Sequence, residues 1–309
     1  MDNYVNLHVH SHYSIGDSVI KVPDLAKKVK EYGQSYIALT DHSSTMGWYE
    51  LQQECNKNGV KPLYGNEFYC KTSLEKPQDR TRYHLVLIAK NEHGLENINK
   101  MQRLAVTEHF YYKPLLPHDI LFENTDDIFC STACALSYIN QNFIEGNDDE
   151  AYSFFNRLLD AFGKDNLAIE LQYHPNFFIN DKKVQEICNS KLIDLYDDTD
   201  CKYIINTFDS HVLEDKDRVI RKKIQSIGYG KPEDAIDDTL KSNVLGTSEL
   251  SFKFAYESGI DDDKLIQKCI DNTYKIAEKC YFERKPYERA IPKFTQHQHF
   301  KEIFLKKVV

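Results

Sequence analysis

The stretch Leu7-His8-Val9-His10 places two histidines at alternate positions of an apolar run near the start of the chain. Successive side chains of a strand point to opposite faces, so His8 and His10 are expected to share a face. The same spacing returns much later in Asp209-Ser210-His211. Imidazole and carboxylate groups are ligands of metals such as zinc, manganese and iron, so both stretches indicate a metal site.

Between these two stretches, histidines and acids recur where predicted strands end. The further candidates are Asp17, His42 of Thr40-Asp41-His42, Glu67 of Gly65-Asn66-Glu67-Phe68, and His84 of Tyr83-His84-Leu85. Together with the first two stretches they exceed the ligand set of a single tetrahedral ion. The sequence therefore predicts a site for several ions.

Short apolar runs alternate with longer amphipathic stretches over the first two thirds of the chain, which is typical of repeated βα units. We expect strands at residues 4–10, 36–40, 61–69, 83–90, 127–131, 167–172 and 203–207. We expect helices at residues 22–32, 46–58, 92–109, 135–144, 150–162 and 182–195. A (βα) barrel collects its active site at the C-terminal ends of its strands, so this α/β pattern predicts a distorted seven-stranded (βα) barrel.

The strand pattern stops after about Lys222, and the remainder is predicted to form helices at residues 249–258 and 262–280. We therefore predict a barrel over residues 1–224 and a mostly helical C-terminal extension over residues 225–309. The extension has amphipathic helices and no candidate ligands, which makes it a candidate surface for a protein partner.

The 309-residue chain has a net charge of −9, which argues against a protein that coats duplex nucleic acid. It does not argue against a nuclease, because bound divalent ions add positive charge at the site. The sequence shows no signal peptide and no apolar run long enough to cross a bilayer, and its eight cysteines form no Cys-x-x-Cys pair. These features predict a cytoplasmic protein with reduced thiols and no membrane association.

These motifs closely resemble the PHP (polymerase and histidinol phosphatase) domain, and in particular the PHP domain that begins bacterial replicative DNA polymerase III α subunits. The stretches that carry the resemblance follow one another along nearly the whole chain. They include His8-Val9-His10-Ser11, Thr40-Asp41-His42, Gly65-Asn66-Glu67-Phe68-Tyr69, Tyr83-His84-Leu85-Val86-Leu87-Ile88, Ala133-Cys134-Ala135-Leu136-Ser137, Asp209-Ser210-His211 and Ile291-Pro292-Lys293-Phe294.

The resemblance implies a barrel of the PHP type and nine ligands around three divalent metal ions, which would be zinc, manganese or iron. The nine are His8, His10, Asp17, His42, Glu67, His84, Cys134, Asp209 and His211. Every position holds a competent ligand, which implies an active enzyme rather than a degenerate scaffold. The cysteine motif departs from the family pattern, since it ends in Ser137-Tyr138-Ile139 where the family often has Ser-Gly-Glu.

The function implied by the resemblance is a metal-dependent phosphoesterase, most directly a 3′→5′ exonuclease that acts on DNA ends during replication. Two alternatives stay open: a phosphomonoesterase of the histidinol phosphatase type acting on a small molecule, and a non-catalytic module that docks on a polymerase. The candidate contacts to a substrate phosphate are His174, Arg80 and Arg82, and His174 is alternatively a proton donor. A replicative DNA polymerase is the candidate partner.

Two further interpretations concern residues near these motifs. Asp41 is a candidate for orienting a ligand imidazole, since such rings need a hydrogen-bond partner behind them. The cation cluster from Arg218 to Lys223 is expected to be a solvated helix face.

The chain stops near Val309, where an α subunit would continue into its polymerase domains. We therefore expect either a free-standing PHP protein or part of a longer polymerase, in a bacterial cell or a phage-infected host.

Overall fold

The computed structural model describes residues 2–72, 81–175, 177–179, 182–236 and 241–284. Its centre is a curled, mixed sheet in which the strands follow the order β1-β2-β3-β7-β8-β11. These strands are β1 (Tyr36–Leu39), β2 (Lys61–Lys71), β3 (Tyr83–Ala89), β7 (Ile128–Ser131), β8 (Leu167–Gln172) and β11 (Tyr203–Thr207). A short seventh strand, β6 (Leu116–Pro117), pairs with β2 beside this path.

The predicted α/β class is confirmed, but β3 runs against its neighbours. It pairs antiparallel with both β2 and β7, whereas β1 with β2, β7 with β8 and β8 with β11 are parallel. The link between β2 and β3 covers only residues 72–82, which is shorter than the dozen or so residues that a parallel crossover requires. The sheet is therefore mixed, unlike the uniformly parallel barrel that we predicted from the alternation.

The strand predicted at residues 4–10 does not form as a regular strand. The segment makes a few backbone hydrogen bonds on each side: Ala38 N–H and Thr40 N–H donate to the Asn6 and Val9 carbonyls, and on the other side Val9 makes an isolated bridge to Ser210. Leu7 packs in the interior of the sheet, and the next side chain, His8, also points inward, so the chain bends at this residue. A regular strand cannot turn two successive side chains to one face, so the sheet is a half-barrel here and not a closed seven-stranded barrel.

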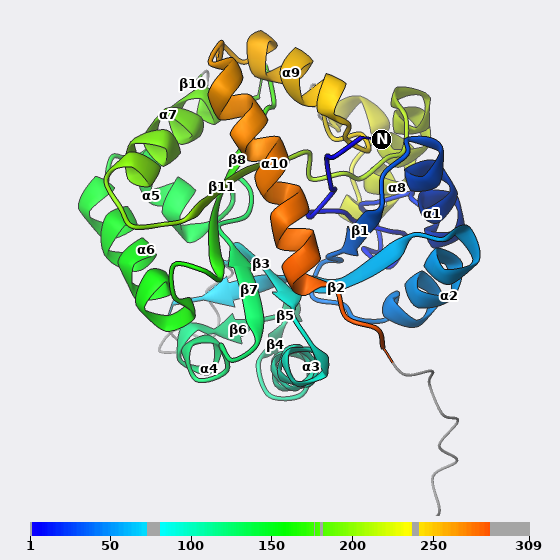
Figure 1. Ribbon diagram of the computed structural model, residues 1–309, viewed down its shortest axis with the longest axis horizontal. Helices are drawn as coiled ribbons and strands as arrows, with labels where there is room; N and C mark the ends of the chain where they lie inside the picture. The colour runs from blue at the N-terminus through cyan, green and yellow to red at the C-terminus, as the bar shows by residue number, and fades with distance from the viewer. Residues whose placement is uncertain (1, 73–80, 176, 180–181, 237–240, 285–309) are drawn as a thin grey trace, which may run out of the picture.

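The inner face of the half-barrel is filled by one apolar cluster. It contains Val5, Leu7, Tyr36, Ala38, Leu63, Val86, Ile88, Phe129, Ala168, Tyr203 and Ile205, together with Ile276, Ala277 and Cys280 of helix α10 (Asp263–Cys280). Helix α10 lies across the middle of the ring of strands (Figure 1). Its Tyr274 ring lies 5.5 Å from the ring of Tyr36, at the start of β1, so the helix covers the end of the half-barrel from which the parallel strands begin.

The remaining helices lie outside the sheet (Figure 1). They are α1 (Val22–Glu31), α2 (Trp48–Asn58), α3 (Glu92–Thr107), α4 (His118–Phe122), α5 (Tyr138–Glu145), α6 (Asp148–Phe162), α7 (Val184–Asp197), α8 (Arg218–Tyr229) and α9 (Ser248–Glu257). All eight predicted helices form, α9 and α10 included, while α4 and α8 had no predicted helix range. No helix of the described residues is long and apolar enough to cross a membrane. The division into a barrel and an extension at residue 224 stays a prediction.

Candidate metal centre

The nine residues that the resemblance implied as ligands all gather at the opposite end of the half-barrel from α10. His8 and His10 come from the N-terminal segment, Glu67 from β2 and His84 from β3, and the others come from loops. His84 lies at the beginning of β3, not at the end of a strand. Because β3 is antiparallel, its beginning lies beside the end of β2, where Tyr69 pairs with His84. The antiparallel direction of β3 therefore places His84 at the same end of the half-barrel as the other candidate ligands.

Glu67 is the hub of the cluster and is fully buried. Its Oε1 lies 3.2 Å from His8 Nε2 and 2.9 Å from His84 Nδ1. Its Oε2 lies 2.6 Å from His42 Nδ1 and 3.3 Å from His10 Nε2. One carboxylate thus touches four imidazoles, which is the arrangement expected of a ligand that bridges neighbouring ions.

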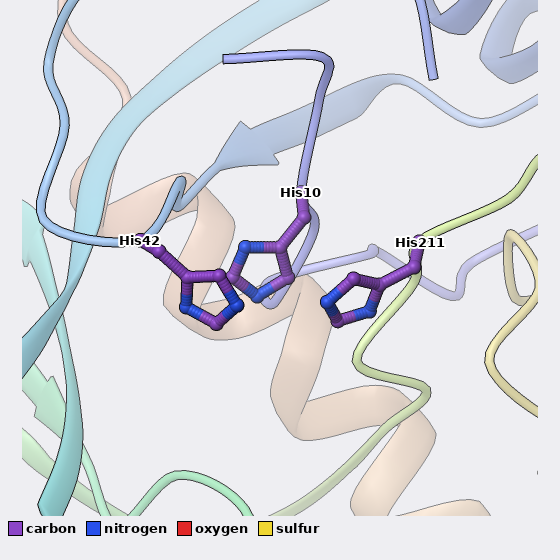
Figure 2. A group of neighbouring side chains, drawn as sticks. All are labelled: His10, His42 and His211. Carbon is purple, nitrogen blue, oxygen red and sulfur yellow. The ribbon is translucent and has the colours of Figure 1, made fainter. Parts of the chain in front are cut away.

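The candidate ligands form three overlapping groups whose ligand atoms lie within 4.8 Å of one another. The groups are His10 with His42 and His211, His8 with His10 and Asp209, and His42 with Glu67 and His84. In the first group the His10 ring lies between the other two, with centroids 4.1 Å from His42 and 4.3 Å from His211 (Figure 2). Because the groups share members, ions held by them would be close neighbours.

Three of the imidazoles are held from behind through Nδ1. His8 Nδ1 lies 2.7 Å from Glu170 Oε1, and His211 Nδ1 lies 2.6 Å from the carbonyl of Asp209. A carboxylate and a carbonyl can only accept, so each Nδ1 carries the proton and donates it. Each Nε2 is then left with a lone pair directed into the cluster, as metal binding requires.

The third imidazole, His10, is held through a serine. Its Nδ1 lies 3.0 Å from Ser14 Oγ, and this hydroxyl donates to Asp41 Oδ1 at 2.7 Å. A hydroxyl that donates its only proton to Asp41 must accept from His10, so Nδ1 of His10 is again the protonated nitrogen. Asp41 therefore orients a ligand, as predicted, but it acts on His10 through Ser14 rather than on its neighbour His42.

Whether the cluster fits a cation depends on the hydrogen bonding of the atoms at its middle. Among the described residues, the buried atoms without a hydrogen-bond partner include His8 Nε2, His10 Nε2, His42 Nδ1, Glu67 Oε2, Asp209 Oδ1 and His211 Nε2. Buried polar atoms are rarely left unpaired, because each costs about 1–3 kcal/mol. Here they converge and are all nitrogen or carboxylate oxygen, so the residues present fit divalent metal ions.

Asp17 joins the cluster from a loop and is held there by α8. Its Oδ2 lies 3.3 Å from both His42 Nε2 and His211 Nε2. Its Oδ1 accepts from Arg221 Nη2 and Gln225 Nε2, both at 2.7 Å, and its carbonyl accepts from Arg221 Nε at 2.9 Å. The expectation that the cations from Arg218 to Lys223 form a solvated helix face is therefore wrong for Arg221, and it is also wrong for Arg218, which is buried. No local pattern could have revealed a contact across 204 residues of sequence.

The electrostatics of the cluster favour bound positive charge. Burial by itself would lower the pKa of His8 and His42, but the surrounding carboxylates outweigh it and raise the pKa of both, that of His42 to about 10. Burial would likewise raise the pKa of Glu67 and Asp209, and the nearby histidines instead hold both well below their usual range. The cluster therefore binds either protons or metal ions, and the two compete.

Backbone conformation also marks the loops that carry the ligands. Asp209 has a φ of 46°, Ser43 after His42 has a φ of 41°, and Ala133 before Cys134 has a φ of 60°. Non-glycine residues rarely adopt the left-handed region, and they cluster at functional sites when they do.

The remaining predicted site residues are placed as follows. Cys134 Sγ lies 3.4 Å from His84 Nδ1, so the cysteine belongs to the cluster despite its altered motif. His174 is buried, and its Nδ1 lies 2.6 Å from Ser242 Oγ. Arg82 lies over the ring of Tyr69, with Cζ 5.4 Å from the ring centroid. Arg80 lies outside the described residues.

Glu170, to which the sequence assigned no role, fixes the His8 ring. Besides His8 it accepts from Thr207 Oγ1 at 2.5 Å, from Gln172 Nε2 at 3.2 Å and from Ser131 Oγ. A buried carboxylate with four donors is well satisfied and rigid. Its register pairing with Ile205, a residue of the inner cluster, places it on the inner face of the sheet.

A cleft of about 1060 Å³ opens over the cluster. Asp17, His42 and His84 line it next to Arg82 and Lys113. The same cleft is also lined by Ile15, Met46, Tyr69, Val106, Leu136, Tyr138 and Tyr229. Its walls therefore combine metal ligands, cations and aromatic rings, which is a setting for a phosphate ester that carries an apolar or aromatic group.

Fold and site together define an α/β protein whose half-barrel carries a buried histidine and carboxylate cluster at its open end. The chain belongs to the PHP domain family, whose profile matches residues 6–174. It is 34% identical to DNA polymerase III subunit alpha of Aquifex aeolicus over 98% of this chain and 27% of that protein. It is 32% identical to the same subunit of Borreliella burgdorferi over 90% of this chain and 24% of that protein. The chain thus spans about a quarter of the length of these relatives.

The solved structures with a partial likeness to this chain include two bacterial proteins. One is histidinol phosphate phosphatase from Lactococcus lactis in complex with zinc, L-histidinol and phosphate, with a TM-score of 0.39 and 15% identity over 74% of this chain and 95% of that chain. The other is a putative metal-dependent phosphoesterase from Bifidobacterium adolescentis, with a TM-score of 0.42 and 13% identity over 67% of this chain and 87% of that chain.

Proposed function

We propose that this chain is a metal-dependent phosphoesterase that removes nucleotides from the 3′ ends of DNA. The observation that supports this most directly is the cluster of nine ligand-type residues at the floor of a large cleft with cationic and aromatic walls. A fold alone does not fix a function, so the proposal depends on this site and not on the half-barrel.

We assign the nine ligand-type residues as the groups that would hold divalent ions, with Glu67 at their centre. Such ions, when bound, would activate water for attack on a phosphate ester and would offset the charge that develops on the phosphoryl group. The chain's own residues supply the rest. Glu170, Ser14 and the Asp209 carbonyl fix three imidazoles in one tautomer, and Arg221 holds Asp17 in place.

His174 contributes as a neutral group. Burial lowers the pKa of His174 to about 4, so its imidazole is uncharged at physiological pH. A neutral imidazole cannot be the acid that protonates the leaving group, so of the two roles considered for His174 we keep that of a hydrogen-bonding contact to a substrate phosphate, although the residue is buried and does not line the cleft. Arg82, in the cleft wall, is assigned as a contact to a substrate phosphate.

We place this activity in the setting of a replicative polymerase. The relatives to which the chain is similar along most of its length are DNA polymerase III α subunits. An exonuclease site gains access to a mismatched 3′ end when a polymerase delivers the strand. Addition of the polymerase should therefore raise turnover on a mismatched end more than on a small phosphate ester.

The test compares three substrates on metal-supplemented protein: 3′-labelled single-stranded DNA, duplex DNA with a mismatched 3′ end, and a small phosphomonoester. We expect release of single nucleotides from the two DNA substrates and its loss in Asp209→Asn. The matched control is His93→Ala, which removes an exposed histidine outside the cleft that pairs, among the described residues, with Asp127. Rapid turnover of the phosphomonoester with no reaction at any DNA end would replace the proposal by the phosphatase alternative.

A further inference from the structure

Two cations of the cleft wall converge on one tyrosine ring. Lys113 Nζ, in β5 (Lys113–Pro114), lies 5.5 Å from the centroid of the Tyr69 ring, and Arg82 Cζ lies 5.4 Å from the same centroid. Lys113 enters this wall because β5 forms a tight hairpin with β4 (Phe110–Tyr111) through Tyr112, whose φ is 60°. Two positive side chains from separate parts of the chain are therefore brought beside one aromatic ring.

The same tyrosine ring is in contact with the metal ligands. It stacks on His42, with centroids 5.4 Å apart and planes 20° apart, and meets the edge of His84 at 5.1 Å. The ring is almost fully buried, so it is a fixed spacer. The two cations thus lie about one aromatic ring beyond the ligand cluster, along the cleft.

Lys113 is not neutralised within the described part of the chain, where no carboxylate forms an ion pair with it. Its side chain is half-buried, and burial and then the charge of Arg82 lower the pKa of Lys113, while Asp17 acts in the opposite direction. A half-buried ammonium without a carboxylate partner among the described residues is unfavourable unless an anion joins it. The carboxylates that line the cleft are those of Asp17, a candidate metal ligand, and Glu145.

We infer that Lys113 and Arg82 form a second phosphate position in the cleft, so that the site takes nucleotide chains with a phosphate on the metal cluster and a neighbouring phosphate on these two cations. The inference rests on the proposed phosphoesterase function of the same cleft and narrows its substrate class. A cationic track beside aromatic side chains is the means by which single-stranded nucleic acids are bound without sequence preference. A small phosphomonoester has no group for the second position.

The test measures binding and turnover of substrates with one phosphate or several. The binding probe is fluorescein-labelled pentathymidylate, followed by anisotropy in chelator so that no hydrolysis occurs. The kinetic probes are pentathymidylate and the p-nitrophenyl ester of thymidine 5′-phosphate, each with manganese. The variants are Lys113→Gln and Lys113→Arg. The control is Lys253→Gln, which removes a similar contact, 5.4 Å from the Phe254 centroid, on exposed α9.

In Lys113→Gln we expect a roughly tenfold weaker Kd for pentathymidylate and a salt slope reduced by about 0.7, the value for one phosphate contact on a single strand. KM for pentathymidylate should rise in parallel while kcat changes less than twofold, and the single-phosphate ester should be unaffected. Lys113→Arg should restore binding, because it keeps the charge. Lys253→Gln should behave as wild type.

Equal losses on both substrates, or no loss on either, would overturn the second phosphate position. The outcome is separable from that of the proposed function. If Lys113 controls pentathymidylate binding but no DNA is hydrolysed, the second phosphate position stands and the exonuclease proposal fails. If DNA is hydrolysed while Lys113→Gln binds and reacts as wild type, the exonuclease proposal stands and the second phosphate position fails.

Discussion

Arg221 of α8 donates to Oδ1 of Asp17 at 2.7 Å and to the carbonyl of the same residue at 2.9 Å. This double contact fixes both the side chain and the backbone of a loop residue, and it leaves Oδ2 directed at His42 and His211. Helix α8 therefore controls the position of Asp17, a candidate ligand near the N-terminus.

Arg221→Ala should weaken the binding of one metal ion by about 10–100-fold, the usual cost of removing the partner of a ligand. Loss of the guanidinium frees the Asp17 carboxylate to rotate away from His42 and His211. Elemental analysis at limiting metal should then show about one equivalent less than wild type. Lys223→Ala, on the same helix but exposed, should retain the full content. Full content in Arg221→Ala would show that Asp17 needs no support.

The protein should bind two to three equivalents of zinc, manganese or iron, because nine candidate ligands exceed the needs of one ion. Chelation should lower the melting temperature, since the ions join segments from separate parts of the chain and stabilise only the folded state. Elemental analysis and thermal unfolding with and without chelator check this. Less than one equivalent after supplementation would contradict a multinuclear centre.

Glu170→Gln should destabilise the protein by roughly 1–3 kcal/mol, because an amide cannot accept from all four donors that the carboxylate now satisfies. The substitution should also remove the contact that keeps the proton on His8 Nδ1, and it should therefore lower the affinity for metal. Denaturant unfolding measures the first effect and metal titration the second. An exchange of Glu186 for Gln, on the exposed part of α7, is the matched control. Unchanged metal affinity in Glu170→Gln would mean that His8 is held by other contacts.

The metal-free protein should lose stability as the pH rises. Despite burial, Glu67 and Asp17 raise the pKa of His42 from 6.5 to about 10. A group whose pKa is raised on folding contributes stability below its unfolded pKa and loses it as the pH passes the folded value. In chelator the melting temperature should therefore fall by several degrees between about pH 6.5 and 10, with the metal-loaded protein less affected. If the melting temperature of His42→Gln falls over the same pH range by the same amount, a group other than His42 causes the fall.

Ile276→Ala should lower the free energy of unfolding by about 2–5 kcal/mol, because its side chain fills the interior of the half-barrel. Removal of α10 should unfold the chain, so this helix cannot be deleted to test a polymerase contact. Glu278→Ala, on the exposed side of the same helix, should change stability little. Denaturant unfolding at saturating metal distinguishes the two variants, and a small effect of Ile276→Ala would show that α10 is dispensable to the core.

The sequence by itself determined the chemistry and the local elements. The alternation of strand-like and helix-like periods predicted the α/β class and all the longer helices except α8, because periodicity records which side of each element faces the core. Residue type alone singled out His8, Glu67 and Asp209 as candidate ligands, because few side chains suit such metals, and the structure brings the three into one cluster.

The tertiary structure decided what depends on contacts between distant residues. The reversal of β3 follows from a short connection, and the bend at His8 follows from two acids, Glu67 and Glu170, that draw this ring inward. The support of Asp17 by Arg221 joins residues 204 positions apart, and Tyr69 brings Arg82 and Lys113 together. Such pairings leave no trace in a local pattern, because their energy arises only when the folded sheet brings the partners into contact.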